Sequence, residues 1–137
     1  MNRQILFRGK RVDNDEWAEG YLFKSWNRAF LLWGMTGDIP NMVEVKPETV
    51  GEFTNLTDKN GNKIFEGDIV KYAHPAFAKP LVGVISWEQC ETGFVLRNEK
   101  PYYYWLAYTN ELYEVIGNIY DSPELWRNYE YLLVPHC

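Results

Sequence analysis

One short segment of the chain holds acidic and amide residues at spacings that could bind a metal ion. Asp58, Asn60 and Asn62 alternate as the first ligands of a calcium loop do. A calcium loop also needs glycine at its sixth position and glutamate at its twelfth, where this chain has Lys63 and Ile69. A hairpin turn explains the alternation better, so we predict no metal site here.

Two carboxylates, Glu66 and Asp68, flank Gly67 at a spacing that could serve acid–base chemistry. Such a site needs a histidine or a second acidic pair beside it, and the neighbouring sequence supplies neither. Gly67 is better explained by the backbone conformation of a turn, and Asp68 by a hydrogen bond within that turn. We therefore predict no catalytic residue in this segment.

His74 and Cys90 are the other candidates for chemistry, and neither lies in a nucleophile motif. We expect an exposed imidazole and an unreactive thiol. His136 and Cys137 are adjacent at the end of the chain, where the entropy of ordering opposes a metal site. The sequence predicts no enzyme, no metal and no cofactor, and an unrecognised enzyme built on a Cys–His pair is the less favoured alternative.

Aromatic residues are more numerous than a chain of 137 residues can bury, with 6 Trp, 10 Tyr and 7 Phe. The densest run could anchor a protein partner or stack on bases. If that run is a strand, alternate rings face opposite sides, and about half of them belong to the core. The predicted interaction surface consists of Tyr102, Tyr103, Tyr104, Trp105 and Trp26.

The net charge of −5 lies wholly in the second part of the chain. Residues 1–50 carry seven basic and seven acidic groups, whereas residues 51–137 carry seven basic and twelve acidic groups. An acidic region repels phosphate, and the basic cluster of Arg3, Arg8, Lys10 and Arg11 fits a solvated strand end. Binding of nucleic acid is therefore an alternative that the charge disfavours.

The pattern of apolar runs and turn residues predicts a mostly β protein. Expected strands cover residues 5–8, 17–23, 29–33, 42–45, 53–56, 63–65, 69–72, 81–87, 93–97 and 112–120. Asn60–Gly61 is the strongest turn signal, because a short hairpin needs positive φ there. Residues 34–40 and 98–110 are expected to be loops, and Gly20 is expected to mark a bend or a bulge.

These elements predict three parts. Residues 1–47 form an antiparallel β-meander, residues 48–121 an SH3-like small β-barrel, and residues 122–137 a short C-terminal helix and tail. Ser122 or Asp121 caps that helix and Pro123 opens it. A β-sandwich uses the same ingredients as the barrel and stays open as an alternative.

Several short motifs follow one another in a fixed order along almost the whole chain. They are Phe7-Arg8-Gly9-Lys10-Arg11, Trp17, Gly20-Tyr21-Leu22, Val45-Lys46-Pro47-Glu48-Thr49-Val50-Gly51, Thr57-Asp58-Lys59-Asn60-Gly61, Ile64-Phe65-Glu66-Gly67-Asp68-Ile69-Val70, Val115-Ile116-Gly117-Asn118-Ile119-Tyr120 and Pro123-Glu124-Leu125. In this order they resemble the YopX-like proteins of bacteriophages and prophages. The resemblance implies an N-terminal β subdomain involved in self-association, an SH3-like C-terminal barrel and a phage or prophage gene in a Gram-positive host. It implies no enzymatic activity and supplies no catalytic residues.

The N-terminus and the cysteines indicate the compartment in which the protein is expected. The N-terminal apolar run ends after three residues, too short for a signal peptide or a membrane span. Two cysteines are too few for a disulfide scaffold, so we expect the cytoplasm of a bacterial host. We predict a non-enzymatic phage or prophage accessory protein that forms a homo-oligomer and binds a host or phage protein, without contact with a membrane.

Overall fold

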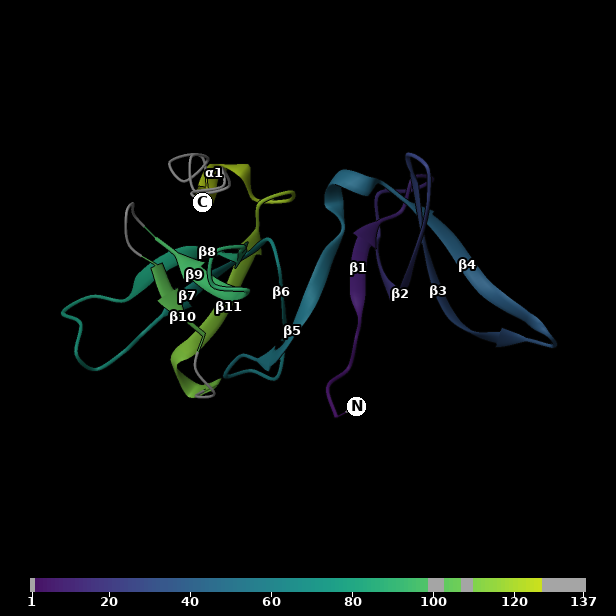
Figure 1. Ribbon diagram of the computed structural model, residues 1–137. Coiled ribbons are helices and arrows are strands. Elements are labelled where there is room, and N and C mark those ends of the chain that lie inside the picture. Colours follow the sequence, from purple (N-terminus) through teal and green to yellow (C-terminus); the bar gives the residue numbers. More distant parts are fainter. Residues whose placement is uncertain (1, 99–102, 107–109, 127–137) are drawn as a thin grey trace. The chain divides into compact units, whose positions relative to one another are not determined.

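The computed structural model describes residues 2–98, 103–106 and 110–126 (Figure 1). Its elements are antiparallel strands with two short 3₁₀ turns and one short helix, which confirms the all-β class. The chain divides into two compact units, Met1–Phe53 and Thr54–Cys137, called the first and second unit below. The sequence pattern places this boundary after residue 47.

The first unit is built from four consecutive antiparallel strands, adjacent in the order β4-β3-β2-β1. Their bounds are β1 Phe7–Lys10, β2 Trp17–Ser25, β3 Arg28–Thr36 and β4 Ile39–Val45. Successive side chains of a strand face opposite sides, and the inner side holds the fully buried Ala29, Leu31 and Val45. The predicted run 29–33 is therefore buried only at alternate positions.

The outer strand of this sheet, β4, is paired at its C-terminal end with the end of β1 and the residues that follow it. Val12 N donates to Glu44 O at 3.1 Å, and Lys46 N donates to Lys10 O at 2.8 Å. Arg11 forms a β-bridge with Val45. The end of β4 is thus closed by the same chain, after which a 3₁₀ turn, η1 (Pro47–Thr49), leads to β5 (Gly51–Thr57).

The segment 34–40, expected to be a loop, instead extends two strands. A bulge with Gly34 at φ 52° shifts the register of β3 against β4, so that Met35 faces Pro40. Proline is tolerated in β4 because an outer strand has no second partner that needs its N–H. The turn that sequence reasoning stretched over seven residues is only Gly37 and Asp38.

Gly20, expected to mark a bend or a bulge, is required for a close approach between β2 and β3. A Cβ atom at this position would lie 2.6 Å from the carbonyl oxygen of Leu32. A side chain there would therefore push the two strands apart.

The second unit contains a five-stranded antiparallel sheet in the order β10-β9-β8-β7-β11, and β6 lies next to β5. The bounds are β6 Lys63–Phe65, β7 Asp68–Tyr72, β8 Leu81–Glu88, β9 Gly93–Arg97, β10 Tyr103–Trp105 and β11 Tyr113–Asn118. A second 3₁₀ turn, η2, covers Asn110–Leu112. The core consists of Ile64, Val70, Ile85, Leu96 and Tyr113, and its closure into an SH3-like barrel stays a prediction.

The helix α1 (Pro123–Trp126) begins at the proline that the sequence indicates. Leu125 N donates to Ser122 O at 2.9 Å, so Ser122 stands at its N-terminal boundary. Residues 127–137 of the predicted tail lie outside the described residues.

Candidate functional site

Asp58, Asn60 and Asn62, whose spacing resembles that of a calcium loop, lie in a turn that is organised around the carboxylate of Asp58. Asp58 is 1% exposed, and its Oδ1 accepts the backbone N–H groups of Asn60 at 2.9 Å and Asn62 at 2.8 Å. Its Oδ2 accepts the backbone N–H of Val115 at 2.9 Å, which ties the turn to β11. These donors occupy the oxygens that a cation would need.

The environment of Asp58 changes its acidity. Burial acts to raise the pKa of this carboxyl, but the hydrogen bonds from the backbone of Val115, Asn62 and Asn60 outweigh it and lower the pKa. Asp58 is therefore ionised at neutral pH and serves the structure as an anionic hydrogen-bond acceptor. This role agrees with the hairpin interpretation of the sequence.

Asp68 is used in a similar way. Its buried Oδ2 accepts the backbone N–H of Phe65 at 2.7 Å, which is a hydrogen bond within its own turn. Gly67 has a φ of 93° and gives the chain the conformation that this turn needs.

His74 and Cys90 do not form a reactive pair. The His74 ring lies 5.8 Å from Tyr72 and 5.5 Å from Phe77, and its Nδ1 accepts the N–H of Ala76 at 3.0 Å. Cys90 is disulfide-bonded, whereas the sequence predicts an unreactive thiol. Within the described residues, no three His, Cys, Asp or Glu side chains gather as a metal site.

A buried ion pair between Glu88 and Arg97 escaped the sequence analysis. The side chains of Arg97 and Glu88 are only 6% and 4% exposed, and they contact each other across β8 and β9. The arginine ends an apolar run, Phe94–Leu96, and the glutamate follows Trp87. Only the alternation of the two strands would have indicated that both charges face inward.

The predicted interaction residues belong to different units. Trp26 lies in the first unit, whereas Tyr103, Tyr104 and Trp105 form β10 of the second unit, paired with β9. Tyr102 and the side chains of β10 lie outside the described residues. The interaction surface predicted for Tyr102, Tyr103, Tyr104 and Trp105 therefore stays a prediction.

Trp26 occupies an unusual position. Ser25 pairs with Arg28, so Trp26 is the first of only two residues in the β2–β3 hairpin loop. Its φ is 62°, in a region that bulky residues rarely adopt, and it is 98% exposed. The indole therefore projects from the tip of the hairpin into solvent.

The outer side of the sheet β2–β3–β4 is also apolar, which the sequence analysis missed. Tyr21, Leu32 and Met42 lie opposite one another across the three strands. Phe23 and Phe30 form the next row, with ring centroids 6.2 Å apart. We call these five residues the outer face. A continuous apolar run such as 21–23 indicates apolar residues on both sides of a strand, so a signal was present.

Several cations of the first unit are neutralised by carboxylates of the same unit. Arg28 donates to both oxygens of Glu44 at 2.9 and 3.0 Å, at the edge of the outer face. Lys46 forms an ion pair with Asp15. These pairs raise the pKa of each base and reduce the positive charge that a phosphate backbone would meet.

A pocket of about 220 Å³ lies where β2 begins and β3 ends. Its apolar lining consists of Trp17, Ala18, Trp33 and Val43, and its charged rim consists of Arg11, Glu16 and Glu19. We call it the Trp17–Trp33 pocket. All of these residues belong to the first unit.

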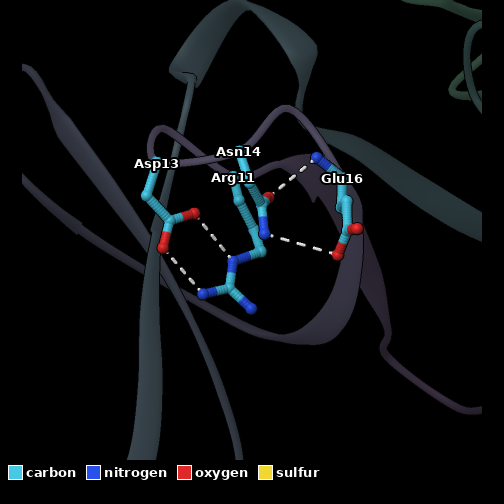
Figure 2. Close-up of polar contacts among 4 residues, drawn as sticks. All are labelled: Arg11, Asp13, Asn14 and Glu16. Atoms are coloured by element: carbon cyan, nitrogen blue, oxygen red, sulfur yellow. Dashed lines mark hydrogen bonds and ion pairs between the residues drawn. The ribbon is translucent and has the colours of Figure 1, made fainter.

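The rim of this pocket is held by the turn between β1 and β2 (Figure 2). Arg11 donates from Nε and Nη2 to the two oxygens of Asp13, at 2.9 and 2.8 Å. Asn14 accepts the backbone N–H of Glu16 at 2.9 Å and donates to its carboxylate at 3.3 Å. These hydrogen bonds restrain the side chains of Arg11 and Glu16 at the rim.

These features define the class of the protein as an all-β chain of two antiparallel units, the first of which exposes an apolar sheet face and an aromatic pocket. The family model described as YopX protein matches residues 6–127, so the chain belongs to the YopX family. This confirms the resemblance of its motifs.

The comparison with solved structures finds protein EF1440 from Enterococcus faecalis. It is 24% identical, with a TM-score of 0.47, and the match covers 90% of this chain and 99% of that chain. None of the curated proteins matches. In the described part of the chain, we find no helix with the length and apolar character to cross a membrane.

Proposed function

We propose that this protein is a non-enzymatic protein-interaction module that associates with itself through the first unit. The observation that carries the proposal is the outer face of β2–β3–β4, where Tyr21, Phe23 and Met42 are all more than half exposed. A contiguous apolar surface of this kind marks an interaction site in a folded protein.

The charge distribution favours a second copy as the occupant of this face. Arg28 and Glu44 neutralise each other beside it, so two such faces can meet without repulsion between like charges. The acidic second unit, in contrast, repels the second unit of another copy and also repels phosphate. The paired cations of the first unit likewise give little support to binding of nucleic acid.

The wider role rests on the family resemblance. We propose that the protein is a phage or prophage accessory protein of a Gram-positive host, that it acts in the cytoplasm, and that its homo-oligomer presents the second unit to a host or phage protein. YopX family membership supports this proposal, and the resemblance of the motifs is to proteins of phages and prophages.

Sedimentation velocity over a range of protein concentrations tests the self-association. We expect an oligomer that the double variant Tyr21→Thr/Phe23→Thr weakens at least tenfold, because it removes two rings from the outer face. Threonine keeps the strand propensity at both positions. The matched control is Val12→Thr, an exposed apolar residue outside the outer face. A wild-type protein that stays monomeric at high concentration would overturn the proposal.

A further inference from the structure

We propose that Trp26 of one copy binds in the Trp17–Trp33 pocket of a second copy of this chain. This inference rests on the proposed self-association and adds a specific contact to it. Two features of the first unit lead to it: a projecting indole with no packing of its own, and a pocket with an apolar lining that includes Trp33.

Trp26 has the conformation of an anchor residue. The first position of a two-residue hairpin loop favours glycine or asparagine, because φ is positive there. A tryptophan at φ 62° is strained, and at 98% exposure it gains no packing within its own chain to offset that strain. Tryptophan is also one of the residue types enriched among those that dominate binding energy in protein interfaces.

The pocket fits an indole in size and in chemistry. A dry cavity of about 150 Å³ holds benzene, so a pocket of about 220 Å³ can hold the two fused rings of tryptophan. Trp33 supplies an aromatic wall beside Ala18 and Val43, and the carboxylates of the rim can accept the indole N–H. The rim is prepared by the hydrogen bonds of Asp13 and Asn14, so little ordering is needed on binding (Figure 2).

The ring of Trp17 lies on the outer side of β2, as Tyr21 does, so Trp17 borders the pocket with its ring turned toward two cations. The guanidinium of Arg8 lies 4.6 Å from the centre of the Trp17 ring, and Lys10 Nζ lies 5.6 Å from it. Cations at these distances are attracted to the ring face and hold its orientation.

The occupant has to come from another copy. Trp17 opens β2 and Trp26 directly follows its last residue, so these two positions lie at opposite ends of one strand. At about 3.3 Å per residue, they are about 30 Å apart, far beyond the reach of a side chain. Two copies with antiparallel β2 strands can each give one Trp26 and receive the other, which is the reciprocity that a two-fold interface needs.

A double-mutant cycle on the full-length protein tests this contact. Trp26→Ala removes the anchor, and Trp33→Ala removes a wall of the pocket. Trp26 is 98% exposed and Trp33 is 43% exposed, so both variants are expected to fold. We expect each variant to weaken association about thirtyfold in sedimentation velocity, and the double variant to weaken it no further than either single one. The matched control is Ile39→Ala, an apolar residue 71% exposed at the other hairpin, which should change association less than twofold.

Photo-crosslinking gives a second readout that does not depend on affinity. Benzoylphenylalanine incorporated at position 26 should crosslink to peptides containing Trp17, Trp33 or Val43 of a second copy. If Trp26→Ala leaves the affinity of self-association unchanged, or if position 26 crosslinks only to other peptides, this inference is overturned. The self-association would then still stand. A wild-type monomer overturns both.

Discussion

The two units of this chain distribute polar and apolar groups in opposite ways. The second unit buries charges, with the Glu88–Arg97 ion pair and the Asp58 carboxylate inside it. The first unit keeps its ion pairs at the surface and exposes rings and aliphatic side chains across a sheet. Its buried hydrophobic cluster is also small, centred on Ala29, Leu31 and Val45.

This difference separates two uses of a β-sheet. Buried charges that are fully hydrogen-bonded make a fold sensitive to any loss of a partner, so the second unit depends on its polar contacts. Exposed apolar residues contribute little to the stability of the isolated chain, so the first unit can lose them without unfolding. Substitutions in the second unit should therefore change stability, and those on the first unit's surface should change association.

The largest effect is expected from Arg97→Met. This substitution leaves the carboxylate of Glu88 buried without its arginine, and breaking a buried pair in this way costs about 3–5 kcal/mol in the free energy of unfolding. The measurement is urea denaturation followed by circular dichroism. The double variant Glu88→Met/Arg97→Met removes both charges and should recover most of the loss. If it is as unstable as the single variant, the pair is not the reason for the loss.

A somewhat smaller loss, about 2–3 kcal/mol, is expected from Asp58→Asn. In the variant, the NH₂ group of the amide replaces the oxygen that accepts the backbone N–H of Val115. Two donors then face each other, and this hydrogen bond is lost. Asp38→Asn is the matched control at an exposed turn and should change stability by less than about 0.5 kcal/mol. Equal effects of the two substitutions in urea denaturation would contradict the role assigned to Asp58.

Asp58 also predicts how stability depends on pH. Its pKa is lower in the folded chain than in the unfolded chain, so its contribution is fully present above about pH 4. The contribution is lost as the pH falls through the lower, folded-state pKa. The wild type should therefore lose more stability than Asp58→Asn during acidification below pH 4. Parallel curves for the two proteins would show that this group does not titrate with folding.

In the first unit, Gly20→Ala tests a position in β2 where an added side-chain atom should not be tolerated. The added Cβ would meet the Leu32 carbonyl at 2.6 Å, and forcing β2 from β3 should cost about 1–3 kcal/mol. Hydrogen exchange read by mass spectrometry should show the loss of protection in β2 and β3. Gly37→Ala is the comparison variant, because its added Cβ would have no atom within 4 Å. Any loss of stability there comes from the positive φ and not from a close contact.

The smallest effect on stability, and the opposite sign, is expected from Trp26→Asn. Asparagine tolerates positive φ better than tryptophan, so unfolding of the monomer should become harder by about 0.5–1 kcal/mol. The measurement should be made at a protein concentration below the association range. A loss of stability there would mean that Trp26 packs within its own chain.

Local turn chemistry made much of this fold predictable from the sequence. Asn60–Gly61, Gly67 and Pro123 each stand where a turn or a helix begins, because positive φ or a missing N–H restricts which residue fits. The strand at Tyr103–Trp105 was not predicted, since no turn signal like Asn60–Gly61 stands beside it and residues 98–110 were expected to be a loop.

The candidate site was less predictable, for a physical reason. Trp26 was named as a contact residue from its type, but the pocket combines Arg11, Trp17, Trp33 and Val43, which the sequence separates widely. Such a set becomes visible only when the register of β2, β3 and β4 is known. The pairing of Glu88 with Arg97 likewise depends on the register of β8 and β9.

The pairing at the end of β4 has a consequence for the size of any assembly. An open sheet edge can recruit further strands and grow into a fibre, as amyloid does. Here the backbone around Val45 is already paired with residues after β1, and Pro40 lacks the N–H that an incoming strand would bond. Copies that meet through faces and side chains rather than through this edge should form a closed particle of fixed copy number.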